Sequence, residues 1–143
     1  MTDTLHLYRV AETAGLPVIP FSLPQTGSVS IQGQDLRCCI GIDESALETE
    51  PEKRVHQAHE LGHCLTGSFY NRHAARPLRR KCELQADKWA IEALISAQAL
   101  DEAVAMGCTE MWMLAEHFGV TEEFMRKAVC WYTHGNLSAE LYF

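Results

Sequence analysis

The stretch "RVHQAHELGHCLTGSFY", residues 54–70, decides how the rest of the chain is interpreted. It places His59 and His63 four residues apart, with Glu60 directly after the first histidine. On an α-helix, residues i and i+4 lie on one face, so the two imidazoles project together and can reach one metal ion. Glu60 is rotated by about 100° from His59, which puts it beside the ion without requiring it to be a ligand. The alternative is a solvated helix that carries two incidental histidines.

The spacing is that of H-E-x-x-H, in which two imidazoles bind zinc and the glutamate takes a proton from a water molecule that zinc activates. Gly62 lies inside the same helix, although glycine costs about 1 kcal/mol relative to alanine there. We interpret Gly62 as the point at which a neighbouring backbone comes close beneath the site. Ala58, Leu61 and Leu65 are expected to form a separate apolar stripe that faces the core.

Local signals mark both ends of this helix. Thr49, followed three residues later by Glu52, fits a capping box, and Pro51 is tolerated in the first turn. Gly67 is expected to end the helix directly after Thr66.

A second helix, expected at residues 78–95, supplies a third ligand. Glu83 and Asp87 are again four residues apart, on a face that they share with apolar side chains. Buried carboxylates are costly unless they are paired or bind a metal. Glu83 therefore completes a His₂Glu set that leaves one position for water, as in catalytic zinc sites. Asp87 is expected to accept a hydrogen bond from one of the two histidines. The alternative is a solvated face paired with the basic run Arg79–Lys81.

Shorter patterns predict the remaining architecture. A short helix is expected at residues 4–14, followed by three runs bounded by turn residues that are expected to form a small antiparallel sheet. Strands followed by helices indicate an α+β fold with a mostly helical C-terminal half, and 143 residues are most simply one domain. The expected strands are residues 17–23, 28–32 and 36–43, and the further helices are expected near residues 98–106, 109–118 and 121–133.

Composition excludes several classes of protein. Hydrophobic residues make up 47% and charged residues 22%, which is ordinary for a soluble globular protein. A net charge of −7 argues against broad binding to nucleic acid. No apolar run is long enough to span a membrane, and the start "MTDTLHLYRV" lacks a secretion signal, so a cytoplasmic location is expected.

The six cysteines show no CxxC pair and no regular spacing. In a cytoplasmic protein we expect them to be reduced thiols. Cys64 follows His63 on the same helix, and we interpret it as a buried free thiol and not as a fourth ligand.

The two motifs together resemble the ImmA/IrrE family of zinc metallopeptidases. "AHELGH" (residues 58–63) is followed by "ELQAD" (residues 83–87), a combination similar to that family's metal site. The strand-like segment "CCIGIDES" (residues 38–45) and the closing "LAEHFGVTEEFMRKAV" (residues 114–129) extend the resemblance over residues 5–133.

The resemblance implies a zincin-like metallopeptidase domain over residues 1–143 that cleaves a helix-turn-helix repressor of a phage or mobile element. The family commonly has Asn where this chain has Asp87, a departure that leaves the ligands intact. The alternatives are a non-catalytic, zinc-stabilised module that captures a repressor, and a DNA-binding regulator.

The residues predict a mechanism for a zinc endopeptidase. Zn²⁺ held by His59, His63 and Glu83 would activate water, and Glu60 would accept the water's proton as it attacks a peptide carbonyl. The substrate is expected to lie extended along an edge strand just before the active helix.

The oxyanion that forms needs a second donor. Tyr70, His73, Tyr132 and His134 are candidates from residue type alone. The alternative for each is a packing or surface role, because aromatic groups usually serve burial.

Two other stretches each allow two interpretations. Residues 71–81 hold five of the twelve Lys and Arg residues. We interpret them as a solvated loop, and the alternative is a docking patch for an acidic partner or a phosphate backbone. Residues 109–134 have the spacing of a helix-turn-helix-like tail. Glu122 and Glu123 occupy the start of its second helix, where they would repel phosphates. We therefore expect this tail to pack on the core or hold a repressor, and we do not expect a nucleic-acid partner.

Overall fold

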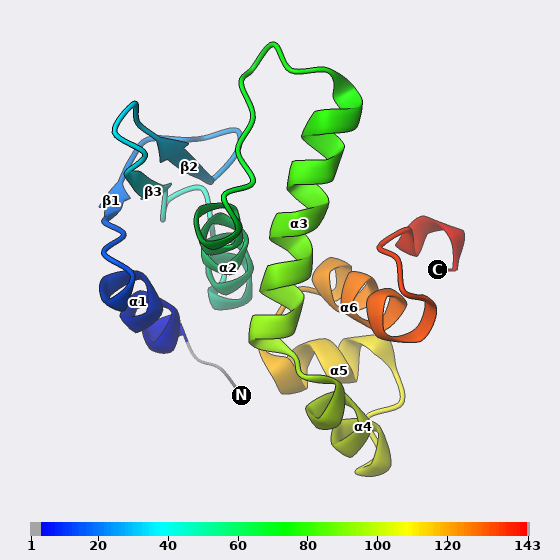
Figure 1. The fold of residues 1–143 in the computed structure, drawn as a ribbon. Helices are drawn as coiled ribbons and strands as arrows, with labels where there is room; N and C mark the ends of the chain where they lie inside the picture. Colours follow the sequence, from blue (N-terminus) through cyan, green and yellow to red (C-terminus); the bar gives the residue numbers. More distant parts are fainter. Residues whose placement is uncertain (1–3, 143) are drawn as a thin grey trace.

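The computed structural model describes residues 4–142 as one short helix, a three-stranded sheet and then a series of helices (Figure 1). The helix α2, which carries the two histidines, lies beside the long helix α3, with the sheet on one side and the last helices on the other. The bounds are α1 Thr4–Thr13, β1 Val18–Pro20, β2 Ser28–Gln32, β3 Cys38–Ile42, α2 Glu50–Thr66, α3 Arg76–Leu94, α4 Ala97–Ala105, α5 Met111–Phe118, α6 Glu122–His134 and the 3₁₀ helix η1 Ala139–Leu141.

The sheet is mixed, so the predicted antiparallel sheet is wrong in one of its pairings. Its strand order is β1-β3-β2; β2 pairs antiparallel with β3, whereas β1 pairs parallel with it, with Val18 opposite Ile40. The hairpin between β2 and β3 inserts β3 beside β1, and two reversals of the chain leave β1 and β3 pointing the same way. Ile40, Gly41 and Ile42 are buried, as expected for a central strand.

This order also corrects the expected place of the substrate strand. The strand directly before α2 is β3, which is central and has neighbours on both sides. The edge strand that packs against α2 is β2.

The predicted caps at both ends of α2 are present, but only half of the predicted capping box is. Thr49 caps the helix by accepting a hydrogen bond from the Glu52 backbone N at 3.2 Å. The Glu52 carboxylate accepts from the Glu48 backbone N at 3.1 Å, one residue before the position that a capping box requires. Gly67 ends the helix with a left-handed φ of 66°.

Gly62 sets the distance between α2 and α3. A Cβ atom at this position would lie 2.5 Å from the carbonyl oxygen of Ala86 and 3.0 Å from its Cα. The two helices therefore touch backbone to backbone, as the sequence predicts, and the residues on either side of Ala86 are brought close to the histidines.

One hydrophobic cluster joins the helices to the sheet. It includes Leu7, Ile40, Leu61, Ile91 and Met125, which come from α1, β3, α2, α3 and α6. The expected apolar stripe of α2 holds for two of its members, because Ala58 and Leu61 are fully buried. Leu65 is 42% exposed, so its assignment to the core is wrong. Leu65 lies in the last turn of α2, next to Cys64, which is bonded to β3, and the structure leaves its side chain at the surface.

Two of the cysteines are joined, contrary to the prediction of reduced thiols. A disulfide connects Cys38 on β3 to Cys64 on α2. Cys64 is therefore neither the free thiol nor the buried residue that the sequence predicts, since it is partly exposed. The pairing comes from packing: α2 lies across the sheet, and no regularity of cysteine spacing reports that contact. Cys39, Cys82, Cys108 and Cys130 are free.

The tail helices α5 and α6 are joined by a three-residue turn that begins at Gly119. Thr121 caps α6 by accepting from the Phe124 backbone N at 3.2 Å. The buried Arg54 of α2 donates to the Gly119 carbonyl oxygen at 2.6 Å, at the end of α5. The tail is therefore attached to the same helix that carries the histidines.

Candidate metal centre

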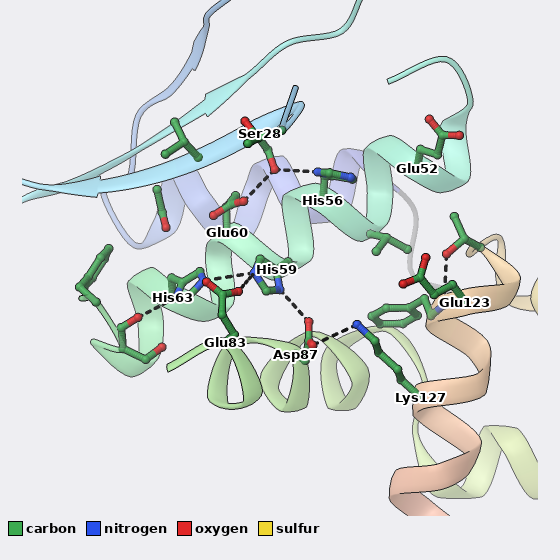
Figure 2. A pocket seen from close by; sticks show the side chains of 18 of the residues that line it. Ser28, Glu52, His56, His59, Glu60, His63, Glu83, Asp87, Glu123 and Lys127 are labelled. Atoms are coloured by element: carbon green, nitrogen blue, oxygen red, sulfur yellow. Dashed lines mark hydrogen bonds and ion pairs between the residues drawn. The ribbon is translucent and has the colours of Figure 1, made fainter. Parts of the chain in front are cut away.

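His59, Glu60 and His63 lie together on α2, as the spacing predicts (Figure 2). One potential ligand atom from each of the three lies within 4.8 Å of the others. The Nε2 atoms of His59 and His63 are 3.1 Å apart. Such close approach of two ring nitrogens indicates that both face the same small volume.

Glu83 of α3 faces these two nitrogens. Its Oε2 lies 2.8 Å from His59 Nε2, and its Oε1 lies 3.3 Å from His63 Nε2. Ligands held at the usual zinc distances by a tetrahedral ion are about 3.3 Å from one another. The three donors therefore fit a zinc-sized ion. Glu83 fits as third ligand better than Glu60, because Glu60 Oε2 accepts a hydrogen bond from Ser28 at 2.7 Å.

The second ring nitrogen of each histidine is also held. His59 Nδ1 lies 2.7 Å from Asp87 Oδ1, and His63 Nδ1 donates to the carbonyl oxygen of Ser68 at 2.6 Å. Both rings therefore point Nε2 toward Glu83, the arrangement by which outer partners orient metal-binding histidines. Asp87 orients His59, which answers a question that the sequence leaves open.

Sequence reasoning missed the role of Ser68. Its carbonyl turns back toward the helix because Gly67 is left-handed, and its backbone N donates to the His63 carbonyl oxygen at 3.1 Å. A glycine directly after a histidine-bearing last turn is the signal from which this contact follows.

Hydrogen bonds within the centre shift the pKa values of its members. Burial alone lowers the pKa of His59, but the hydrogen bonds to Asp87 and Glu83 raise it to about 10. Burial likewise opposes the raised pKa of His63, which its contacts with Glu83 and Ser68 produce. Burial disfavours the ionised carboxylates, yet hydrogen bonds from the histidines hold the pKa of Glu83 and of Asp87 below the usual range. Without metal, these shifts favour the charged forms of the two histidines and of the two carboxylates.

Of the four candidate oxyanion donors, the structure brings Tyr70 to the centre. Its hydroxyl donates to Glu83 Oε1 at 2.6 Å, and this bond, with burial, raises the pKa of Tyr70 to about 12. His73 accepts a hydrogen bond from its neighbouring arginine, Tyr132 donates to a backbone carbonyl at the end of α3, and His134 stacks on an aromatic ring near the C-terminus. These three are not among the residues that line the cleft.

The centre opens into a cleft of about 1090 Å³ (Figure 2). Its walls come from β2, α2, the segment after α2, α3 and the first turns of α6. Residues from these walls include Thr26, Val29 and Ser30 of the β2 side, Glu52 and Val55 of α2, Phe69 and Arg72 after α2, and Thr121, Glu123 and Phe124 at the start of α6. A cleft of this size exceeds that of an ordinary small-molecule pocket and suits a stretch of peptide.

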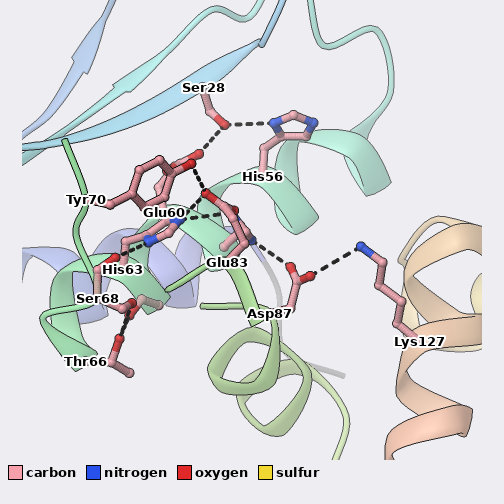
Figure 3. Close-up of polar contacts among 12 residues, drawn as sticks. Ser28, His56, Glu60, His63, Thr66, Ser68, Tyr70, Glu83, Asp87 and Lys127 are labelled. Carbon is pink, nitrogen blue, oxygen red and sulfur yellow. Dashed lines mark hydrogen bonds and ion pairs between the residues drawn. The ribbon is translucent and has the colours of Figure 1, made fainter. Parts of the chain in front are cut away.

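Two further polar connections were not apparent from the sequence (Figure 3). Ser28 of β2 lies between His56 and Glu60 of α2, within hydrogen-bond distance of both. Lys127 of α6 lies 3.3 Å from the free oxygen of Asp87. Both connections join elements far apart in sequence, so no local pattern reports them.

Comparisons with known proteins agree with the geometry. The family model Peptidase_M78, described as the IrrE N-terminal-like domain, matches residues 11–129. None of the curated proteins compared with the chain matches it.

Residues 4–142 contain no helix with the length and apolar character that crossing a bilayer requires.

Proposed function

The chain belongs to the IrrE N-terminal-like peptidase family, and from that premise we propose that it is a zinc-dependent endopeptidase with its centre at the meeting of α2 and α3. Membership supports a metallopeptidase-like function and implies a protein substrate. The observation that carries the assignment is the convergence of His59, His63 and Glu83, whose donor atoms lie 2.8–3.3 Å apart.

These three side chains would hold the ion. A zinc ion bound there would polarise the peptide carbonyl and make water more acidic. Glu60 lies beside the two ring nitrogens and is buried, which supports a role in which it would take a proton from water and pass it to the leaving amine.

Tyr70 is our candidate for the donor that stabilises the oxyanion. Its hydroxyl lies against Glu83, and a tyrosine hydroxyl is protonated at neutral pH, as a hydrogen-bond donor must be. Tyr132 and His134 have partners away from the cleft, which makes them poorer candidates.

The substrate groove is proposed to follow the edge strand β2. One side of β2 pairs with β3, and among the described residues no strand pairs with its other side. Thr26, Val29 and Ser30 line the cleft. An extended peptide can add to such an edge through main-chain hydrogen bonds, which places its carbonyls beside the centre.

A helix-turn-helix repressor of a phage or mobile element remains our proposed substrate, with a cytoplasmic location. The family membership supports a protein substrate, and the first turn of α6 offers Glu122 and Glu123 where a DNA-reading helix would need donors. A regulator that binds DNA is therefore the less favoured alternative.

The test uses the helix-turn-helix protein encoded nearest to the gene, incubated with zinc-loaded protein and analysed by mass spectrometry. Wild-type protein is expected to cleave it at defined bonds. Glu60→Gln is expected to keep zinc but lose roughly 10²–10⁴-fold in rate, since that is the usual contribution of a general base. Binding without cleavage by the wild type would favour the non-catalytic capture module, and full activity of Glu60→Gln would remove Glu60 from the mechanism.

A further inference from the structure

Two hydrogen bonds connect Ser28, on the edge strand β2, to Glu60 and His56 of α2 (Figure 3). The Ser28 hydroxyl donates to Glu60 Oε2 at 2.7 Å and lies 2.8 Å from His56 Nδ1. Ser28 and Glu60 are both 7% exposed. A hydrogen bond to a charged group in such a buried place is stronger than one at the surface.

The direction of both hydrogen bonds follows from the inventory of donors. A serine hydroxyl has one hydrogen, and an ionised carboxylate accepts only. When Ser28 donates to Glu60, it must accept from His56, so the His56 ring carries its hydrogen on Nδ1. Burial lowers the pKa of His56, which keeps the ring neutral with a single N–H.

The backbone that leads into Ser28 is held in place independently of the Ser28 side chain. Gly27 has a left-handed φ of 76°, its N donates to the Leu23 carbonyl oxygen, and its own carbonyl oxygen accepts from the Asp43 N, both at 2.8 Å. A Cβ at Gly27 would lie 2.6 Å from Leu47 Cδ2. Ser28 therefore enters β2 from a turn that leaves it little freedom to move.

Glu60 has a competing use that this arrangement prevents. A carboxylate oxygen of Glu60 and the ligating nitrogens of His59 and His63 lie within 4.8 Å of one another, so a small rotation of the side chain would make Glu60 a ligand. A carboxylate that ligates the ion occupies the position that water needs and can no longer accept its proton.

We propose that Ser28, oriented by His56, is a positioning residue that holds Glu60 as a base and keeps it from becoming a fourth metal ligand. Ser28 engages Oε2 and leaves Oε1 to receive the proton of water. The inference rests on the proposed role of Glu60 as general base, and it adds two residues, one on β2 and one on α2, that the H-E-x-x-H motif does not contain.

The first test measures His56 in the metal-free wild-type protein by ¹⁵N NMR and needs no variant. We expect the Nδ1–H tautomer at neutral pH, retained in Ser28→Thr and lost in Ser28→Ala. A wild-type ring protonated on Nε2 alone would overturn the proposal, because Ser28 would then have to donate to His56 and could not hold Glu60.

The second test replaces zinc by Co²⁺ and records the visible spectrum, which reports the ligands of the ion. Ser28→Ala is expected to change the spectrum as Glu60 becomes a ligand, and the double variant Ser28→Ala/Glu60→Gln is expected to restore it. Ser28→Thr, which keeps the hydroxyl, and the distant Ser138→Ala should match the wild type. An unchanged spectrum in folded Ser28→Ala would overturn this inference alone.

The kinetic arm uses the substrate of the cleavage assay, or fluorescein-labelled casein in its absence. The kcat of Ser28→Ala is expected to fall roughly ten- to hundredfold, the worth of one hydrogen bond to a charged group, with KM changed less than about twofold. Failure of the wild type to bind Co²⁺, or full activity of Glu60→Gln, would overturn the proposed function instead. The two failures are therefore distinguishable.

Discussion

The Nδ1 atom of His59 lies 2.7 Å from Oδ1 of Asp87, across the interface between α2 and α3. This contact turns Nε2 of the same ring toward Glu83, 2.8 Å away. Each nitrogen of this α2 imidazole therefore contacts a different carboxylate of α3. The geometry of the metal centre depends on how firmly that contact is held.

Asp87 can be tested by two substitutions that differ in what they retain. Asp87→Ala removes the partner of His59 and is expected to weaken zinc binding roughly 10- to 100-fold, the usual effect of losing such a partner. Asp87→Asn keeps a carbonyl oxygen as acceptor, so its loss should be smaller. Competition with a chromogenic chelator measures both, and equal affinities for wild type and Asp87→Ala would contradict the role.

A substitution of Lys127, on the tail helix α6, should also weaken the contact between Asp87 and His59. It lies 3.3 Å from Asp87 Oδ2, and both side chains are partly exposed. Because partly exposed ion pairs are worth little, Lys127→Met should lower zinc affinity by no more than roughly fivefold, with the effect fading at high salt. Lys81→Met is a matched control on an exposed part of α3. A larger effect that persists at high salt would show that Lys127 acts through packing.

Metal affinity is expected to depend on pH because protons and the ion compete for the same nitrogens. The pKa of His59 is about 10 without metal, and that of His63 is also raised. Binding must release these protons, so affinity should rise with pH up to about pH 10. Calorimetry in buffers of different ionisation enthalpy counts the protons released, and a count of zero at pH 7 would contradict this prediction.

The stability of the metal-free protein should change in the opposite direction. His59 has a folded pKa raised above the usual 6.5, so its contribution is complete below about pH 6.5 and is lost as pH rises toward 10. Glu83 and Asp87 have lowered pKa values, so their contribution is present above their usual 4.5 and 3.8 and is lost as pH falls. Thermal unfolding without metal should show a decline in Tm between pH 6.5 and 10 that added zinc reverses.

Gly62→Ala should separate α2 from α3. The added Cβ would meet the Ala86 backbone at 2.5 Å, and a backbone atom cannot turn aside as a side chain can. We expect a loss of about 1–3 kcal/mol in the free energy of unfolding, despite the better helix propensity of alanine. Gly33→Ala is the control, since its Cβ would meet the movable side chain of Asp35 at 3.1 Å. Equal stability of the two variants in urea would contradict the close approach.

The Cys38–Cys64 disulfide leaves four free cysteines. Alkylation of the purified, unreduced and denatured protein is expected to label those four, whereas reduction first should expose all six. In cells lysed directly into the alkylating agent, a cytoplasmic location predicts six labels because that compartment keeps thiols reduced. Six labels without reduction in the purified protein would contradict the disulfide.

The ends of α2 and α6 and the end of α5 were predictable because the chain carries capping signals there. Thr49, Gly67, Thr121 and Gly119 mark helix ends through contacts with neighbours in sequence, and the four-residue spacings report faces. The same local logic placed His59 and His63 on one face of α2, whereas Glu83 was reached through the cost of burying an unpaired carboxylate.

What the sequence did not predict depends on contacts between distant segments. The parallel pairing of β1, the Cys38–Cys64 bond and the place of Ser28 beside Glu60 are set by where the sheet lies against α2. Alternating or apolar runs predict that strands exist, but they do not give their order. Residue type alone proposed four oxyanion donors because it does not report which aromatic side chains face the cleft.

The anchoring of the tail bears on how the molecule unfolds. Arg54 sits on the helix of the metal centre, is buried, and gives a hydrogen bond to Gly119 in the turn between α5 and α6. Truncation before α5 would remove this acceptor from the buried Arg54 side chain, and we expect it to destabilise the part of the chain that remains. The part of the chain that carries the metal centre and the tail are therefore expected to unfold in one cooperative transition, so that neither could be exchanged for a foreign segment without loss of stability.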